Sequence, residues 1–330
     1  MPPLLSTARR WLGWGAFVAL PLAPRMGLAQ ANNGALDLVA PIGAHATGMG
    51  TAFVAEEGSE SIWWNPAGLA RLDHSAFAID HSENFFVKDD GISLIAAINR
   101  LGAAGITARY FNYGAQPAVD IVGNETGELL TRSIALGASF ATTFGPRVNG
   151  GVTYRLYQSR IDCSGLCEGQ ETGSSTTSAV DAGVQFAPLP ARPLRIGVEV
   201  RNLGLSLQVK DKPQADALPT RLHVGAAFDP RFKGMVPELT LRTTAEIVSA
   251  LDLGNSEVHV GGQVGYKTGS TTLIARGGYV WQQGGGISSG PALGLGLASR
   301  RVQLDLARIF EDFSSTLGKP PTYISIRVGL

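Results

Sequence analysis

The sequence carries little charge and no excess of either sign. Lysine and arginine together number 27, and so do aspartate and glutamate, so the formal net charge of the 330 residues is zero. This balance excludes the basic surface on which a nucleic-acid-binding protein depends. Charged residues make up 16% of the chain, whereas about 25% is usual in a soluble domain. The chain is therefore charge-poor, and no nucleic-acid partner is expected.

Long apolar runs are also missing. After residue 31 no stretch reaches the roughly 18 uninterrupted apolar residues of a membrane-spanning helix, and the best run, at 94–98, is stopped by Asn99 and Arg100. Disorder is not expected, because 44% of the residues are hydrophobic and the net charge is nil. The 42 glycines disfavour a helical bundle, since glycine destabilises helix interiors. What remains is a Gly-rich, mostly β chain.

Residues 1–31 have the features of a secretory signal peptide. Arg9 and Arg10 supply a positive start, residues 11–22 are largely apolar, and Ala29-Gln30-Ala31 is an A-x-A cleavage site. Cleavage after Ala29 is an alternative, and the paired arginines leave twin-arginine export open. Removing 1–31 leaves 24 basic and 27 acidic residues, a net charge of −3. We therefore expect an exported protein.

Cysteine is nearly absent. Cys163 and Cys167 are the only two, in the sequence DCSGLCEGQ. A metal site would need further ligands, and neither a histidine nor a second cysteine pair lies nearby. Export makes a local disulfide between the two the favoured interpretation. No pair of histidines has zinc spacing such as H-E-x-x-H, so neither a metal nor a cofactor is predicted.

From residue 74 onward, apolar and polar residues alternate with the period of a β-strand. In the last segment Ile324, Ile326 and Val328 alternate with Ser325 and Arg327. This pattern predicts about fourteen antiparallel strands, most of them close to the roughly 9–11 residues that cross a membrane with tilt. The predicted strands are 75–81, 91–99, 103–113, 131–143, 148–159, 176–187, 194–204, 219–228, 238–249, 257–266, 271–281, 291–298, 302–310 and 322–330.

The predicted connections nearly alternate in length. Those after even strands are mostly turn-like, whereas those after odd strands are mostly longer and polar, which is typical of outer-membrane barrels. The longer ones are 82–90, 114–130, 160–175, 205–218, 282–290 and 311–321. Aromatic residues near strand ends fit a girdle at the membrane interfaces. They are Tyr110, Tyr113, Tyr157, Tyr266, Tyr279, Trp281, Phe310 and Tyr323.

One face of each predicted strand carries polar or charged residues such as Arg155, Asp181 and Glu199. In a dry sandwich core these charges would need partners, whereas a hydrated or plugged lumen tolerates them. A soluble β-sandwich with that face in water is the alternative. In lipid every backbone N–H and C=O must be paired, so a sheet has to close on itself. We therefore expect an all-β fold, a roughly 14-stranded antiparallel transmembrane β-barrel over 74–330.

Residues 32–73 do not alternate and are rich in Gly and Ala. They contain PIGAHATGMGTAFVAEEGSESIWWNPAGLARL at 41–72. The runs GMG-x-AFVA at 48–55 and WNPAGLA at 64–70 resemble the N-terminal signature of the PorV/PorQ family, which belongs to the FadL-like outer-membrane barrels. The resemblance implies a fourteen-stranded barrel whose N-terminal segment, here 32–73, forms a hatch in the lumen.

The resemblance also implies the Gram-negative type of outer membrane as the location, and outer-membrane lipids as partners. FadL-like members pass long-chain fatty acids or other hydrophobic molecules, so the first predicted function is passage or binding of such a ligand through a plugged barrel. PorV-like members serve type IX protein secretion, so a scaffold that binds exported cargo or secretion-system proteins is the alternative. A non-specific porin is a third possibility.

Several hatch residues fit this role by their own chemistry. Met49, Phe53, Trp63 and Trp64 offer apolar surface inside an otherwise polar lumen, and Asn65-Pro66 favours a turn. These six are the predicted ligand-binding or hatch residues. Two interpretations remain open: the residues anchor the plug, or they line a path for a hydrophobic ligand.

No enzyme is predicted. No Walker A motif occurs, and GISSG at 286–290, which matches G-x-S-x-G around Ser288, is followed by no histidine. An esterase or protease at the barrel mouth would need residues that converge only in space, and a sequence pattern does not display such a site.

Overall fold

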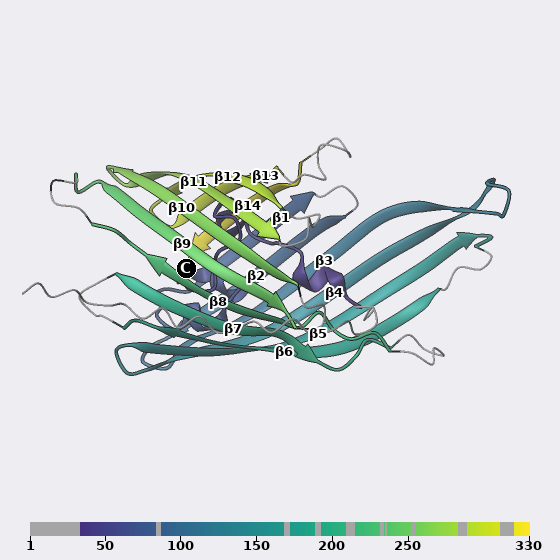
Figure 1. Ribbon diagram of the computed structural model, residues 1–330, viewed down its shortest axis with the longest axis horizontal. Helices are drawn as coiled ribbons and strands as arrows, with labels where there is room; N and C mark the ends of the chain where they lie inside the picture. The colour runs from purple at the N-terminus through teal and green to yellow at the C-terminus, as the bar shows by residue number, and fades with distance from the viewer. Residues whose placement is uncertain are drawn as a thin grey trace, which may run out of the picture.

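In the computed structural model the chain forms one closed barrel of fourteen antiparallel strands, in which β1 pairs with β14 (Figure 1). The structure describes residues 34–330 except 84–86, 168–171, 189–192, 209–214, 232–233, 235, 252–254, 283–288 and 311–319. The predicted signal peptide and Ser288 lie outside the described residues. Closure of the sheet excludes the sandwich alternative. The strands are β1 Ala76–Glu83, β2 Lys88–Ile98, β3 Gly102–Val119, β4 Glu125–Phe144, β5 Val148–Gly165, β6 Gly173–Phe186, β7 Leu194–Gly204, β8 Arg221–Phe228, β9 Leu239–Ala250, β10 Ser256–Thr268, β11 Thr271–Gln282, β12 Gly290–Ser299, β13 Val302–Ile309 and β14 Thr322–Gly329.

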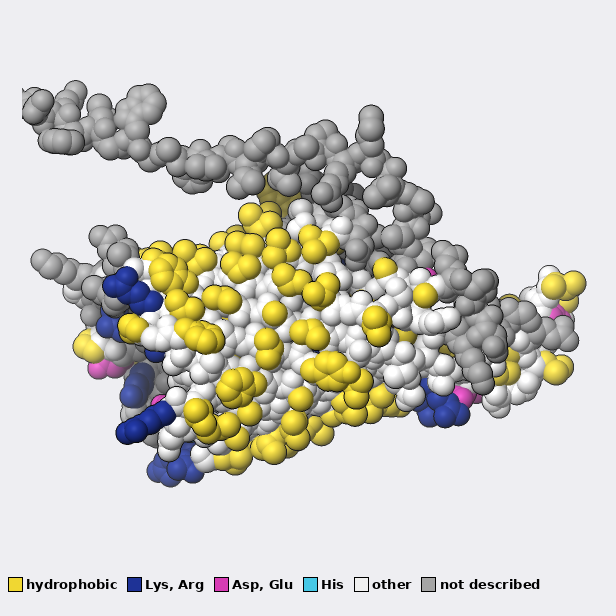
Figure 2. Space-filling model, turned by 90° about the horizontal axis from the view of Figure 1, so that it is seen from below, with side chains coloured by type: hydrophobic (Ala, Val, Ile, Leu, Met, Phe, Trp, Pro, Cys, Tyr) yellow, Lys and Arg dark blue, Asp and Glu magenta, His cyan; other side chains and the backbone are white. Residues whose placement is uncertain are grey.

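The alternation of the sequence becomes the inside and the outside of the barrel. Asp181 and Glu199 point inward and are each 2% exposed, whereas Leu295 and Ile324 point outward and are 64% and 45% exposed. Figure 2 shows hydrophobic side chains spread over the outer wall, with most of the visible Lys and Arg near one end and a further group near the other. The outer surface therefore has the apolar band that hydrocarbon would cover.

Three strands are much longer than the sequence predicts. β3, β4 and β5 have 18, 20 and 18 residues, and β3 and β4 project beyond the other strands (Figure 1). The expected loops 114–130 and 160–175 are wrong over much of their length, because strands occupy most of both ranges. The expected loop 82–90 is also too long, since β1 ends at Glu83 and β2 begins at Lys88. The backbone stays paired out to Val119 with Glu125. Where strands project beyond a membrane, both of their faces meet water. The alternation of apolar and polar residues is then lost, although the backbone hydrogen bonds between the strands continue.

The predicted aromatic girdle is only partly correct. Tyr110, Tyr266, Tyr279, Trp281 and Phe310 are exposed on the outside. Tyr157 and Tyr323 are 3% and 1% exposed and face the lumen, and Tyr113 donates a hydrogen bond to Asp37 inside the barrel. Alternate residues of a strand point to the same side. Tyr157 therefore faces the lumen with Arg155, and Tyr323 faces it with Ser325.

Residues 34–75 precede β1 and lie inside the barrel, and we refer to them as the hatch (Figure 1). Four short helices form in it: η1 Leu36–Val39, α1 Ala44–Gly48, η2 Ser59–Ile62 and η3 Pro66–Leu69. The helix α1 lies beside β11 to β14, whereas η3 lies beside β3 to β6, so the hatch bridges opposite walls of the barrel. In the part of the chain that is described, no helix has the length and apolarity needed to cross a membrane.

Candidate functional site

The backbone of the hatch lies directly on glycines of the barrel wall. A Cβ atom added to Gly278 of β11 would overlap backbone atoms of Met49 and Gly50, and one added to Gly261 of β10 would overlap Met49. Only residues without a side chain allow two backbones to approach so closely. Inward glycines on seven further strands also face hatch atoms: Gly91, Gly105, Gly151, Gly183, Gly197, Gly225 and Gly294.

Wall side chains also hydrogen-bond the hatch backbone. Glu246 of β9 accepts from the N–H groups of Phe53 at 2.7 Å and Val54 at 2.9 Å. Gln185 of β6 donates to the carbonyl oxygens of Val54 at 3.1 Å and Glu56 at 2.8 Å. A hydrogen bond to a charged group such as Glu246 contributes about 1.5–3 kcal/mol and a neutral one such as that from Gln185 about 0.5–1.5 kcal/mol, so these bonds hold the middle of the hatch against the wall.

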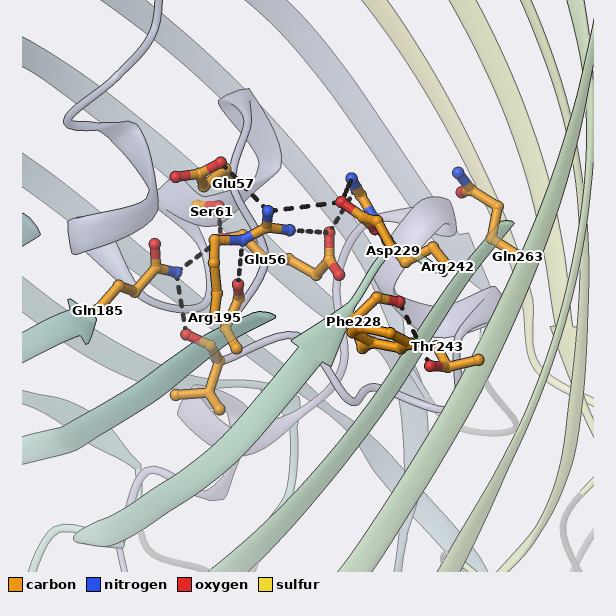
Figure 3. Close-up of polar contacts among 12 residues, drawn as sticks. Glu56, Glu57, Ser61, Gln185, Arg195, Phe228, Asp229, Arg242, Thr243 and Gln263 are labelled. Atoms are coloured by element: carbon orange, nitrogen blue, oxygen red, sulfur yellow. Dashed lines mark hydrogen bonds and ion pairs between the residues drawn. The ribbon is translucent and has the colours of Figure 1, made fainter. Parts of the chain in front are cut away.

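A cluster of charged residues fixes the hatch at the end of the barrel with the shorter turns (Figure 3). Glu56 of the hatch accepts from Arg242 at 2.7 Å, and Arg242 also donates to both oxygens of Asp229, at 2.5 and 3.0 Å. Arg195 lies 3.6 Å from Glu57 and from Asp229. Burial raises the pKa of Glu56, against the charges of Arg242 and Arg195. Burial also acts to raise the pKa of Asp229, but its hydrogen bonds to Arg242 outweigh this and hold it below its ordinary value.

Asn65 and Pro66 begin the last helix of the hatch. The side chain of Asn65 accepts from the N–H of Ala67 at 3.0 Å, and Pro66 occupies the first turn, where its missing N–H needs no partner. The amide nitrogen of Asn65 donates to the carbonyl of Val54 at 2.7 Å. Asn65 therefore ties two passes of the hatch chain together.

Three of the predicted apolar residues are packed within the hatch and the wall. Met49, Phe53 and Trp63 are 0%, 1% and 6% exposed. The indole N–H of Trp63 donates to Asp80 of β1 at 2.9 Å. Phe53 lines a cavity of about 210 Å³ near the turns, next to Glu60. These contacts attach the hatch to the barrel wall.

Trp64 alone among the six predicted residues lines the main cavity, of about 280 Å³. Its indole N–H donates to the carbonyl of Ile42 at 3.1 Å, which leaves the ring as part of the cavity wall. The wall strands contribute residues close to their ends at the longer connections, so the cavity lies on that side of the hatch. The apolar part of its lining includes Val39, Pro41, Trp64, Val280, Ile309 and Tyr323.

Another part of the lining is polar and carries two cations. The guanidinium of Arg201 lies 5.4 Å from the ring centre of Trp64, and Arg221 lies 3.4 Å from Glu257. Among the described residues, the Nε atoms of both arginines have no hydrogen-bond partner. His223 contacts Glu246 through Nδ1 at 2.6 Å, and its Nε2 likewise has none. Buried polar atoms are normally paired, so these three unpaired atoms are an uncommon feature of the buried wall beside the cavity.

No motif in the sequence marks this polar lining, because its members lie on different strands. Arg201 is on β7, His223 on β8 and His259 on β10. The alternation of apolar and polar residues places each of them on the inward face of its strand. Each also lies near the end of the strand that is joined to a longer connection. That combination is the signal in the sequence that could have found them.

Cys163 and Cys167 are joined as a disulfide at the end of β5, with their Cα atoms 6.2 Å apart. Both lie in the ribbon formed by the long strands β3, β4 and β5, away from the cavity. Within the described ranges no three His, Cys, Asp or Glu side chains are grouped so that they could hold a metal ion.

Comparison with solved structures shows similarity to barrels of the FadL and TodX kind. The Pseudomonas putida toluene transporter TodX has a TM-score of 0.58 at 11% identity, covering 87% of this chain and 98% of that one. The Ralstonia pickettii toluene transporter TbuX has a TM-score of 0.57 at 13% identity, covering 87% and 98%. A Pseudomonas aeruginosa FadL homologue has a TM-score of 0.54 at 10% identity, covering 88% and 98%. No protein-family model and no curated protein matches the sequence.

At these identities the similarity extends to the fold. The chain is a 14-stranded barrel like those of FadL and TodX, with a segment of short helices before the first strand. The FadL-like part of the resemblance found in the hatch sequence is thus supported at the level of architecture.

Proposed function

We propose that the chain binds hydrophobic small molecules of the fatty-acid type and passes them through a plugged outer-membrane barrel. The main cavity is the observation that carries this proposal. One part of its lining is apolar, around Trp64, Val280 and Ile309, and the other presents Arg201 and Arg221. Such a lining suits an amphiphile, whose chain is buried against the apolar wall while its head group meets the cations.

The outer membrane of the Gram-negative type is the proposed location. A barrel has no unpaired strand edge, and outward residues such as Leu295 and Ile324 supply the surface that lipid tails would cover. The predicted signal peptide at 1–31 would supply the export step. Outer-membrane lipids are then the surrounding partners.

The ligand class is narrowed by the cavity. The similar barrels TodX and TbuX are toluene transporters by name, which supports a hydrophobic ligand for this chain as well. A pure hydrocarbon would bring apolar matter against the guanidinium groups of Arg201 and Arg221, which line the cavity, and covering charged groups in this way is unfavourable. A carboxylate would pair with them, so we expect a fatty acid to bind more tightly than a hydrocarbon.

The experiment measures ligand binding to the purified barrel in a non-ionic detergent by titration calorimetry. Dodecanoate, dodecanol and toluene separate the contribution of the carboxylate from that of the apolar chain. We expect dodecanoate to bind most tightly, and Trp64→Ala to weaken its binding by about tenfold or more, as loss of a buried aromatic contact would. Trp281→Ala is the matched control, because Trp281 is 68% exposed on the outer wall. Absence of binding by all three ligands would overturn the proposal.

A secretion scaffold is the second candidate, and the ribbon of β3, β4 and β5 favours it. Ile121 and Val122 at the turn between β3 and β4 are fully or largely exposed, at 104% and 75%. Exposed apolar residues at a projecting tip are typical of protein contacts. The finer assignment to PorV/PorQ rests on the runs at 48–55 and 64–70 and stays a prediction. Absence of type IX secretion genes from the source genome would discard it.

A non-specific porin is the least favoured of the three. Its lumen would conduct ions, whereas here the hatch bridges opposite walls and is held by wall residues such as Glu246 and Gln185. Low ion conductance of the purified barrel in a planar bilayer is therefore expected.

A further inference from the structure

A chain of hydrogen bonds joins the hatch to the barrel wall at the main cavity. The hydroxyl of Thr51 lies 2.8 Å from Nδ1 of His259, and Nε2 of His259 lies 3.0 Å from a carboxylate oxygen of Glu257. All three residues line the cavity of about 280 Å³. Thr51 and His259 are 4% and 6% exposed, so the chain is shielded from bulk water.

The chemistry of the three groups sets the direction of this chain. A carboxylate only accepts hydrogen bonds, so Nε2 of His259 must carry a proton and donate it to Glu257. A neutral imidazole carries one proton, which leaves Nδ1 as an acceptor facing the Thr51 hydroxyl. The hydroxyl has a second acceptor, the Gly50 carbonyl at 2.8 Å, so its proton can lie toward either. Hydroxyl, imidazole and carboxylate thus form a chain in which each group is within hydrogen-bond reach of the next.

The backbone at Thr51 is strained. Its φ angle is +58°, in the left-handed region that β-branched residues rarely adopt. Among the non-glycine residues with positive φ in the described chain, Thr51 is the one with a β-branched side chain. Glycine would occupy this position without strain, yet the position carries a hydroxyl. Asn202, with φ of 56°, lines the same cavity. Strained residues cluster at active sites, where the surrounding structure holds them in place.

Two arginines, Arg201 and Arg221, line the same cavity as Thr51. Arg221 lies 3.4 Å from Glu257 and lines the cavity together with Thr51. The Nε atoms of Arg221 and Arg201 have no hydrogen-bond partner among the described residues, although that of Arg201 lies 3.9 Å from Glu199. An arginine N–H can stabilise the oxyanion of a tetrahedral intermediate.

We propose that this arrangement hydrolyses carboxylic esters that have an apolar acyl or alcohol part. Thr51 Oγ1 bonds to the ester carbonyl carbon while its proton passes to Nδ1 of His259. The intermediate collapses, the bond to the alcohol oxygen breaks, and that oxygen takes the proton from Nδ1. Water then bonds to the acyl carbon while its proton passes to Nδ1 of His259, the bond between that carbon and Thr51 Oγ1 breaks, and Oγ1 takes the proton back, which releases the acid. Thr51 and His259 are the catalytic residues, and Glu257 is a positioning residue.

This activity goes beyond the proposed passage of hydrophobic molecules, although it uses the same cavity. The test follows hydrolysis of 4-nitrophenyl butyrate and 4-nitrophenyl octanoate by the purified full barrel in detergent. We expect Thr51→Gly, which relieves the backbone strain, to reduce the rate about 100-fold or more, as loss of the nucleophile requires. Thr51→Ser should retain activity, His259→Gln should lose it, and Glu257→Gln should lower it and shift its pH profile.

A further measurement and a control variant distinguish a catalytic role of Thr51 from a structural one. A fluorophosphonate probe should add to Thr51, as a mass increase of the peptide that contains it, and Thr51→Gly should not be labelled. Thr243→Ala, at an exposed position on β9, is the matched control and should change neither readout.

The inference is overturned if the parent barrel hydrolyses neither ester, or if Thr51→Gly is as active as the parent. It is also overturned if Thr51→Gly loses dodecanoate binding together with hydrolysis, because Thr51 would then only shape the cavity. Dodecanoate binding by the parent without hydrolysis would reject this activity and leave the proposed function standing. Failure of the parent to bind any of the three hydrophobic ligands would reject the proposed function instead.

Discussion

Glu60 of the hatch and Arg327 of β14 form a buried ion pair that joins residues 267 positions apart in the sequence. Glu60 also accepts from the N–H of Ala46 at 2.7 Å, so its carboxylate holds α1 as well. Arg327 in turn lies 3.2 Å from Asp305 of β13. The hatch is therefore tied to the last two strands of the chain through one carboxylate.

This relationship predicts that docking of the hatch depends on pH. Burial raises the pKa of Glu60 from 4.5 to about 7; Arg327 offsets part of this rise, whereas Asp80 and Asp305 add to it. Because the pKa of Glu60 is higher in the folded state than in the unfolded chain, protonation of Glu60 stabilises the fold. This stabilisation is complete below about pH 4.5 and is lost as the pH rises through about 7. We expect the Tm of the barrel to fall over this range, and Glu60→Gln to flatten the dependence. Thermal unfolding followed by circular dichroism at pH 4 to 8 measures it.

Glu238→Gln provides the control for this experiment, because Glu238 is exposed in the connection before β9. Its removal should leave the slope of Tm against pH unchanged. An equal slope in the parent and in Glu60→Gln would contradict the role assigned to Glu60.

The glycines of the wall give a second prediction, with neighbouring residues as test and control. A side chain at Gly278 would overlap the hatch backbone, whereas one at Gly277 would meet only a leucine methyl group 4.0 Å away. Gly278→Val should therefore displace the hatch and raise ion conductance in planar bilayers, at an overpacking cost of about 1–3 kcal/mol. Gly277→Val should conduct like the parent barrel. Equal conductance in both variants would show that the hatch does not depend on this contact.

Removing the Glu246 carboxylate should loosen the middle of the hatch. Glu246→Ala leaves the N–H groups of Phe53 and Val54 without their acceptor, and each such loss costs about 1–3 kcal/mol. Hydrogen exchange of these two amides should become faster, whereas the amides of β4 should keep their protection. Glu246→Gln, which retains one acceptor oxygen, should give an intermediate rate. Unchanged exchange at Phe53 and Val54 in Glu246→Ala would disprove this anchoring role.

The disulfide should matter little to the barrel. It joins Cys163 and Cys167, only four positions apart, so the entropy it removes from the unfolded chain stabilises by about 2 kcal/mol or less. The double variant Cys163→Ser/Cys167→Ser should keep the Tm of the barrel within a few degrees. Protease cleavage near residue 165 should increase, because the constraint acts at the end of β5. Failure of this variant to form a heat-modifiable barrel would contradict the prediction.

The sequence predicts the strands well where one face meets an apolar surface and the other a polar one. β13 and β14 match their predicted ranges closely, because residues such as Asp305 and Arg327 alternate with outward Leu304 and Ile326. The same rule failed for the outer halves of β3, β4 and β5. In those outer halves the strands are maintained by backbone hydrogen bonds and not by burial of one face. The sequence there shows no alternation of apolar and polar residues from which the strands could be predicted.

Prediction of the site was more limited. The apolar hatch residues stand out in the sequence, and Trp64 does line the main cavity. Thr51 and His259, by contrast, are 208 positions apart and carry no joint motif. Their contact depends on where the hatch meets β10, which follows from the register of the whole barrel.

Local periodicity is sufficient to encode the strands, their inward and outward faces and the presence of a separate N-terminal segment, because each depends on neighbours within a few residues. The path of the hatch and the meeting of Thr51 with His259 arise from contacts between distant segments. Inward glycines such as Gly278 make room for that path, and their effect exists only once the barrel has closed around the hatch.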